Sequence, residues 1–166
     1  MAFSKIIAES MDLTDTYNFS GTVTGAGGDN KPYFFAYQVD PHTVITNGAN
    51  TKVIFETELV DSASAFATSR FTVPSGEGGY YALSSQIFVD NTDGGYSEML
   101  WYVNGSNYSK SASDWDNLNS NNGGTRIFNL AAGDYVEIYA YQNSGSNRNT
   151  YKSDKYCYFG GYKLAT

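Results

Sequence analysis

The segment "AAGDYVEIYAYQNSG" (residues 131–145) shows the alternation that decides the fold class. Every second position is aliphatic, as in a β-strand whose one face packs on a core: Val136, Ile138 and Ala140. The positions between them should face water, yet three of them are aromatic: Tyr135, Tyr139 and Tyr141. The segment therefore predicts a strand with two apolar faces, and the second face needs a surface to cover it.

Other segments of similar length have strand-like patterns and are bounded by Gly-, Asn- and Asp-rich turns. In residues 80–90 a single face carries four apolar side chains: Tyr81, Leu83, Ile87 and Val89. No window has an apolar stripe at helical spacing. We expect strands within residues 31–39, 51–59, 69–75, 80–90, 96–106, 125–130, 133–142 and 155–165. About eight to ten short antiparallel strands predict an all-β sandwich or barrel rather than a βαβ fold.

The chain has 166 residues, which suits one domain with a substantial core. Its net charge is −7, with acidic residues scattered along the sequence. A nucleic-acid groove requires a basic stripe, and binding to an anionic membrane surface requires a basic patch, so neither partner is expected. The single cysteine, Cys157, permits no intrachain disulfide, and we interpret it as a small buried hydrophobic residue.

Residues 1–30 differ from the rest of the chain. They carry isolated apolar residues and end in the Gly-rich stretch "GTVTGAGGDN", which bends easily but packs poorly. We interpret residues 1–30 as an extended arm and residues 31–166 as a head domain. The N-terminus also lacks the apolar run of a signal peptide and no window reaches the length of a membrane span, so synthesis in a cytoplasm is expected.

Four elements occur in an order that resembles the globular head of complement component 1q and its tumour necrosis factor relatives. They are "KPYFFAYQ", "TKVIFETE", "FTVPSGEGGYYAL" and the pair "LAAGDYVEIYAYQN" and "YFGGYKL". The resemblance covers about residues 31–166 and implies a jelly-roll β-sandwich that forms a homotrimer. No collagen repeat precedes the head, so a secreted protein with a collagen stalk is not expected.

The segment "SKIIAESMDLTDTYNFSGTVTGAG" resembles the leaders of tail-fibre and virion-surface proteins of tailed bacteriophages. This resemblance implies a non-enzymatic structural protein on the virion surface, made in the host cytoplasm. It would be a trimeric knob, either a capsid decoration (cement) protein or a short fibre, whose arm binds other virion proteins. The candidate anchor residues are Leu13, Tyr17, Phe19 and Val23.

The second apolar face of residues 131–145 becomes a candidate trimer contact under this resemblance, because tyrosine supplies area while its hydroxyl tolerates partial wetting. The candidate interface residues are Tyr135, Tyr139, Tyr141 and Tyr158, with Phe159 as a core or interface neighbour. The alternative is that these tyrosines are exposed on an ordinary sandwich face, which could also serve as a platform for binding sugars.

Residues 104–124, "NGSNYSKSASDWDNLNSNNGG", form a long polar connection with a few aromatic residues. This composition suits adaptable contacts around rigid aromatic anchors, although a solvated loop that binds nothing has the same composition. If the loop binds a host surface glycan or protein, the protein is a receptor-binding adhesin at a fibre tip, which is the alternative function. The candidate contact residues are Tyr108, Trp115, Asn117 and Asn119.

The sequence contains few residues in patterns typical of a catalytic site. The only histidine, His42, has no marked nucleophile or orienting partner, and the spaced carboxylate pairs Glu56/Glu58 and Asp114/Asp116 are more typical of solvated strand faces. The stretch "DNTDGG" begins like a calcium loop, but Trp101 occupies the position of the bidentate glutamate. We therefore expect no enzyme and no cofactor, and calcium stays an open alternative.

Overall fold

The computed structural model describes residues 30–40, 42–90, 95–115, 120–151 and 155–165. These residues form strands and connections with no helix, and therefore no helix that could cross a membrane. The strands are β1 (Tyr33–Tyr37), β2 (Val44–Ile45), β3 (Thr51–Lys52), β4 (Thr57–Asp61), β5 (Phe66–Ala67), β6 (Arg70–Thr72), β7 (Gly79–Asp90), β8 (Gly95–Val103), β9 (Ser106–Trp115), β10 (Ser120–Leu130), β11 (Tyr135–Gln142), β12 (Arg148–Thr150) and β13 (Tyr158–Ala165).

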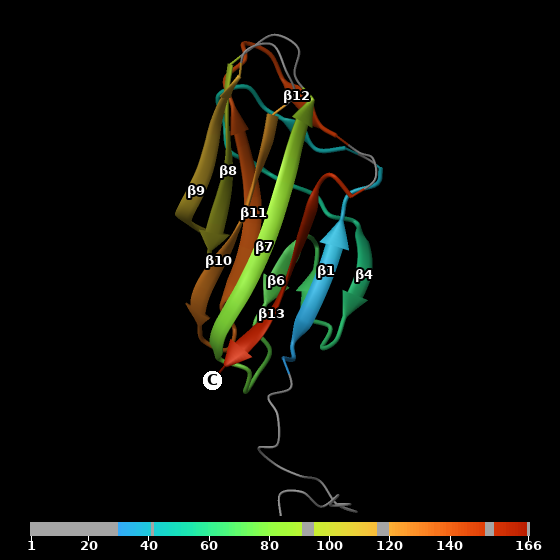
Figure 1. Ribbon diagram of the computed structural model, residues 1–166, viewed down its shortest axis with the longest axis vertical. Coiled ribbons are helices and arrows are strands. Elements are labelled where there is room, and N and C mark those ends of the chain that lie inside the picture. Colours follow the sequence, from blue (N-terminus) through green and yellow to red (C-terminus); the bar gives the residue numbers. More distant parts are fainter. Residues whose placement is uncertain (1–29, 41, 91–94, 116–119, 152–154, 166) are drawn as a thin grey trace, which may run out of the picture.

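Two antiparallel sheets pack face to face. The seven-stranded sheet has the order β2-β12-β7-β13-β1-β4, with β10 on the other side of β7. The six-stranded sheet has the order β5-β6-β11-β8-β9, with β3 also paired to β11. Figure 1 looks onto the seven-stranded sheet, with β8, β9 and β11 behind it. The predicted all-β jelly-roll sandwich is confirmed.

The core lies between the sheets and is built from the inward positions of each strand. Val136, Ile138 and Ala140 of β11 are fully buried, as their alternation predicts. So are the four residues expected to share a face of β7: Tyr81, Leu83, Ile87 and Val89. Aromatic rings fill the centre, where Phe34 stacks on Phe71 with 4.7 Å between the ring centroids. The long strands and their inward faces were therefore predicted correctly.

The expected strand over residues 51–59 is wrong as a single element. The chain pairs with β11 through β3, leaves that sheet, and then pairs with β1 of the other sheet through β4. Val53 and Phe55 lie between the two strands and are buried in the core. Their alternation imitates one strand because both side chains point inward while the chain crosses from sheet to sheet.

The expectation of a long loop over residues 104–124 is also wrong. Most of this segment belongs to β9 and to the first half of β10, which pair with β8 and β7 respectively. Backbone hydrogen bonds to these neighbours hold the segment in the sheets. Polar side chains suit such edge strands, which is why composition alone imitated a loop.

Candidate functional site

The outer face of the seven-stranded sheet carries an aromatic surface. Because antiparallel partners share a face, the ladders place outward side chains of four strands in rows. One row pairs Tyr33 of β1 with Tyr162 of β13, and the next pairs Phe35 with Gly160. The same rows continue through Ala82 and Ser84 of β7 to Ile127 and Thr125 of β10. Most large side chains of this surface come from β1 and β13.

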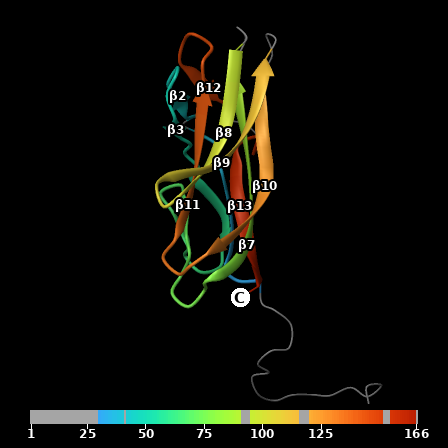
Figure 2. The same cartoon turned by 90° about the vertical axis from the view of Figure 1, so that its left-hand side faces the viewer.

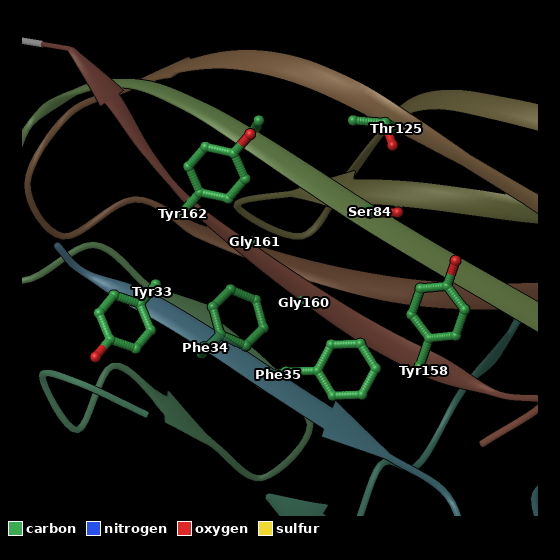
Figure 3. Close-up of a pocket in the computed structure, with 10 residues that line it drawn as sticks. Tyr33, Phe34, Phe35, Ser84, Thr125, Tyr158, Gly160, Gly161 and Tyr162 are labelled. Atoms are coloured by element: carbon green, nitrogen blue, oxygen red, sulfur yellow. The ribbon is translucent and has the colours of Figure 1, made fainter. Parts of the chain in front are cut away.

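A hollow of about 490 Å³ opens in this surface, and we call it the aromatic groove. Gly160 has no side chain between Tyr158 and Tyr162 (Figure 3), and the ring of Phe35 packs over it from the neighbouring strand. A Cβ atom at Gly160 would lie 2.7 Å from Cδ2 of the Phe35 ring. The groove is lined by Tyr33, Phe34, Phe35, Ala82, Ser84, Thr125, Tyr158, Gly160, Gly161 and Tyr162.

Several large side chains around the groove are exposed. The exposed fractions are 45% for Tyr162, 39% for Tyr33 and 56% for Ile127. Within the chain, Phe35 stacks on Tyr158 with 5.4 Å between the centroids, which keeps these two rings in place. An apolar face of this kind on a sheet suits a second apolar surface or a flat ligand.

The tyrosines that the sequence placed at the trimer contact lie on the other side of the molecule. Tyr135, Tyr139 and Tyr141 share the outer face of β11 in the six-stranded sheet. Other residues of the same chain contact each ring. The guanidinium carbon of Arg70 is 4.0 Å from the Tyr135 ring centroid, and Tyr102 stacks on Tyr139 at 4.1 Å. Tyr141 meets Tyr96 edge to face.

A buried carboxylate explains how this tyrosine face is organised. Glu137 lies between Tyr135 and Tyr139 and accepts hydrogen bonds from Lys52 Nζ at 2.7 Å and from Arg70 Nε at 2.9 Å. Burial by itself raises the pKa of Glu137, but the two cations outweigh burial and the net pKa lies below its usual value. The face is thus a charged and stacked network within one chain.

Tyr158 and Phe159 do not belong to that face. Tyr158 lies on the outer face of the seven-stranded sheet, within the aromatic groove. Phe159 is fully buried and is part of the core. Phe159 is therefore a core neighbour, one of the two roles expected for it. The expectation that the four tyrosines share one surface is wrong, because Tyr158 lies in a different sheet from Tyr135, Tyr139 and Tyr141.

Most of the other predicted site residues lie outside the part of the chain that the structure describes. The candidate anchor residues Leu13, Tyr17, Phe19 and Val23 lie outside the described residues, as do Asn117, Asn119 and most of "DNTDGG". Trp115 ends β9, and its side chain is also outside the description. Tyr108 is on β9 with 60% of its surface exposed.

The residues of the groove that sequence analysis missed are Tyr33, Phe35 and Tyr162. Their signal was present: adjacent glycines, Gly160 and Gly161, interrupt a strand with aromatic residues on both sides. Glycine inside a strand often marks close approach or a hollow. The stronger alternation in residues 131–145 favoured β11 as the contact surface instead.

The described residues show little catalytic apparatus. They contain no group of three or more His, Cys, Asp or Glu side chains that could hold a metal ion. Cys157 is fully buried, and burial raises the pKa of its thiol to about 11. A thiol with such a pKa carries almost no thiolate at neutral pH, so it is a poor nucleophile.

Comparison with known proteins gives one sequence relative. No protein-family model matches the chain. It is 28% identical over 121 residues to the phage-like element PBSX protein XkdV of Bacillus subtilis (strain 168). The match covers 66% of this chain but only 18% of that protein. The chain thus spans less than a fifth of the length of its relative.

Solved structures match over most of the chain. The globular domain of a zebrafish complement 1qA protein has a TM-score of 0.59 and 17% identity, covering 81% of this chain and 98% of that one. Murine APRIL at pH 8.0 has a TM-score of 0.58 and 16% identity, covering 80% and 98%. Eiger TNF from S. frugiperda has a TM-score of 0.59 and 12% identity, covering 81% and 94%. Together with the two-sheet topology, these matches show that the chain has the jelly-roll fold of complement 1q and tumour necrosis factor heads.

Proposed function

We propose that this chain is a non-enzymatic structural module of a phage-type particle and that it assembles as a homotrimer through the aromatic groove. The observation that carries the proposal is the apolar outer face of β1, β13 and β10 around the groove, where Tyr33, Tyr162 and Ile127 are exposed. The fold favours a trimer, since trimers are what its resemblance to complement and tumour necrosis factor heads implies. Similarity to a protein of a phage-like element favours the particle.

A second copy of the chain is the occupant that best fits the groove. A closed three-fold ring would cover the same apolar face in each copy. Tyrosine is well suited to such a contact because the ring is buried while the hydroxyl stays partly wet. Tyr162 and Tyr33 occupy the rim of the groove in this arrangement, whereas Tyr135 and Tyr139 already have partners within their own chain.

The trimer can be tested by comparing one tyrosine from each face. Tyr162→Ser removes an exposed ring at the groove, and Tyr139→Ser removes a ring from the opposite sheet. If the groove is the contact, Tyr162→Ser should weaken association by about 2 kcal/mol per contact, whereas Tyr139→Ser leaves association unchanged. Sedimentation over a range of protein concentrations measures both effects.

The result also decides between the two candidate surfaces. Weaker association of Tyr139→Ser with an unaffected Tyr162→Ser protein would move the contact to Tyr135, Tyr139 and Tyr141. A wild-type chain that is monomeric at all concentrations would contradict the homotrimer itself. Thermal unfolding of each variant checks that the change in association is not a loss of folding.

The arm provides the attachment to the particle in this proposal. We assign that role to residues 1–30, with Leu13, Tyr17, Phe19 and Val23 as apolar anchors on other virion proteins. For a surface knob of the decoration or short-fibre type, deletion of residues 1–24 should release the protein from particles while the head stays folded and trimeric. Retention of the truncated protein on particles would contradict the assignment.

Receptor binding is the second candidate function, and Tyr108 is the observation that favours it. Its ring projects from the edge strand β9 with 60% of its surface exposed. A rigid exposed aromatic residue is a common anchor for a host glycan or protein. For an adhesin, free head should block infection and Tyr108→Ala should reduce the blocking. Full infection in the presence of saturating head would exclude this function.

A further inference from the structure

The sandwich has an edge where strands from the two sheets lie next to each other without pairing. β9 pairs with β8, β10 pairs with β7, and no ladder between described residues joins β9 to β10. Figure 2 turns this edge toward the viewer and shows the two strands separating toward its lower part. We call the edge between residues 108–111 of β9 and residues 124–128 of β10 the seam.

The positions that face each other across the seam follow from chain connectivity. β10 begins after a connection of four residues, 116–119, and runs back alongside β9. Counting from this connection places Ser111 level with Gly124 and Ser109 level with Arg126. The ring contact between Tyr108 and Phe128, with 5.1 Å between centroids, agrees with this alignment.

Three polar atoms at the seam are buried and have no hydrogen-bond partner among the residues that the structure describes. They are Nε1 of Trp101, Oγ of Ser109 and Oγ of Ser111. Trp101 is fully buried, lies opposite Ser109 in the β8–β9 pair, and packs its ring 5.5 Å from that of Phe128. Buried polar groups in proteins almost always have a partner, so three such atoms in one corner point to a water molecule or a ligand that supplies one.

The facing strand supplies space and a positive charge. Gly124 and Arg126 lie opposite Ser85 and Leu83, which are both fully buried, so they occupy the core-facing side of β10. Gly124 is exposed, and no described atom lies within 4 Å of the position that its Cβ atom would take. Arg126 starts on the core-facing side but is exposed. Its guanidinium is therefore accessible to a ligand from solvent, two positions along the strand from Gly124.

We propose that the seam binds an acidic sugar. The guanidinium of Arg126 matches a carboxylate, which it can hold with two parallel hydrogen bonds. The hydroxyls of Ser109 and Ser111 both donate and accept, as sugar hydroxyls do, and the indole N–H of Trp101 donates to a ligand oxygen. The seam must widen to admit the ligand, and widening breaks no backbone hydrogen bond between β9 and β10.

This site is separate from the proposed trimer contact. Thr125 and Ile127 point to the outer face of the seven-stranded sheet, whereas Gly124 and Arg126 point to the other face of the same strand. A failure of sugar binding therefore leaves the trimer proposal intact. A failure of the trimer likewise leaves the seam intact.

The indole N–H of Trp101 is a direct reporter of binding. The chain has two tryptophans, so the full-length protein with ¹⁵N-labelled tryptophan should give two indole signals, which Trp115→Phe assigns. Glucuronic acid, glucose, acetate and inorganic phosphate would be titrated separately. We expect a saturable shift of the Trp101 signal with glucuronic acid that exceeds the response to each of the other three.

Variants at the seam sharpen the test. Arg126→Gln should weaken glucuronic acid binding about tenfold, and Gly124→Val should block it by filling the open space. Asn129→Ser, which changes an exposed residue on the opposite face of the same strand and outside the aromatic groove, should bind as the wild type does. The dispersion of the remaining spectrum shows whether each variant is folded. If Gly124→Val does not fold, Arg126→Gln is sufficient for the test.

The proposal is overturned if the Trp101 signal shows no saturable shift with glucuronic acid at tens of millimolar. It is equally overturned if Arg126→Gln binds as well as the wild type. A response to acetate or phosphate as strong as that to glucuronic acid would show a simple anion site and would overturn the assignment to a sugar.

Discussion

Glu137 shows how a residue among tyrosines is kept charged. Its side chain is 4% exposed, whereas those of Lys52 and Arg70 are 30% and 40% exposed. Burial opposes the charge, but two cations at hydrogen-bond distance outweigh it and lower the pKa. Ionised Glu137 therefore stabilises the folded state relative to the unfolded chain.

The lowered pKa of Glu137 predicts how stability depends on pH. A group whose pKa is lower in the folded state stabilises that state above its unfolded pKa, which is about 4.3 for glutamate. This stabilisation is lost as the pH falls from there through the folded pKa. Glu137→Gln should cost about 1–2 kcal/mol at pH 7 and remove this part of the acid sensitivity. Urea unfolding at several pH values measures both effects.

An exposed glutamate provides the control for this prediction. Glu58 on β4 is exposed, so Glu58→Gln should leave the free energy of unfolding nearly unchanged from pH 7 downward. If Glu137→Gln retained the full acid sensitivity of the wild type, another carboxylate would have to carry it. The coupling of Glu137 to Lys52 and Arg70 would then contribute little to stability.

The tyrosine face also shows what alternation can and cannot predict. The sequence predicted correctly that Tyr135, Tyr139 and Tyr141 share the outer side of a strand. It could not predict which side chains contact the tyrosine rings, because Arg70 and Tyr102 come from other strands of the sheet. Side chains far apart in the sequence become neighbours only through strand order, and alternation within one segment carries no information about that order.

At the scale of strands, the two glycines of β13 have different roles. Gly160 faces outward and forms the floor of the aromatic groove, whereas Gly161 faces the core. A Cβ atom at Gly161 would lie 2.5 Å from the carbonyl oxygen of Ala82 and 2.5 Å from Cδ2 of Leu83. The backbone oxygen belongs to the central strand β7 and cannot move aside easily. Close packing of β13 on β7 therefore requires glycine at position 161.

We predict that Gly161→Ala destabilises the protein by about 3 kcal/mol, since overpacking against backbone is relieved only by moving a strand. The midpoint of urea unfolding measures the loss, and failure of the variant to fold agrees with the prediction. Gly124→Ala is the matched control, because its Cβ would meet nothing within 4 Å. Equal midpoints for the two variants would contradict the packing argument.

The elements that the sequence predicted well are those with strong apolar alternation. β7 and β11 lie in the middle of their sheets and carry fully buried residues at every inward position named in advance. β9 and the first half of β10 were missed because they lie at sheet edges and are polar: serine is frequent in β9, and asparagine and glycine fill the start of β10. The crossing from β3 to β4 was missed because an irregular segment with two inward side chains has the same pattern as a strand.

At the scale of the whole molecule, the two outer faces differ in what they offer a partner. The six-stranded sheet presents tyrosines that pack against other rings or Arg70 of the same chain, beside the ion pairs of Glu137. The seven-stranded sheet presents the aromatic groove and the exposed Tyr33, Tyr162 and Ile127. Composition revealed a surplus of aromatic residues but could not assign them to a face. The proposed assembly rests on this asymmetry, which emerges only when both sheets are formed.

Association through an apolar face should respond to salt in a specific direction. Each copy carries a net charge of −7, so three copies repel one another when they assemble. Raising the salt from about 0.02 M to about 0.5 M shortens the range of this repulsion and should lower the dissociation constant severalfold. Sedimentation in sodium chloride at constant pH measures the change.

Tyr162→Ser provides the control for this prediction. It should associate more weakly at both salt concentrations, but the ratio of its two dissociation constants should equal that of the wild type, because the substitution leaves the net charge unaltered. If salt instead weakened the trimer, attraction between opposite charges would have to hold it together, and the aromatic groove would not be its main contact.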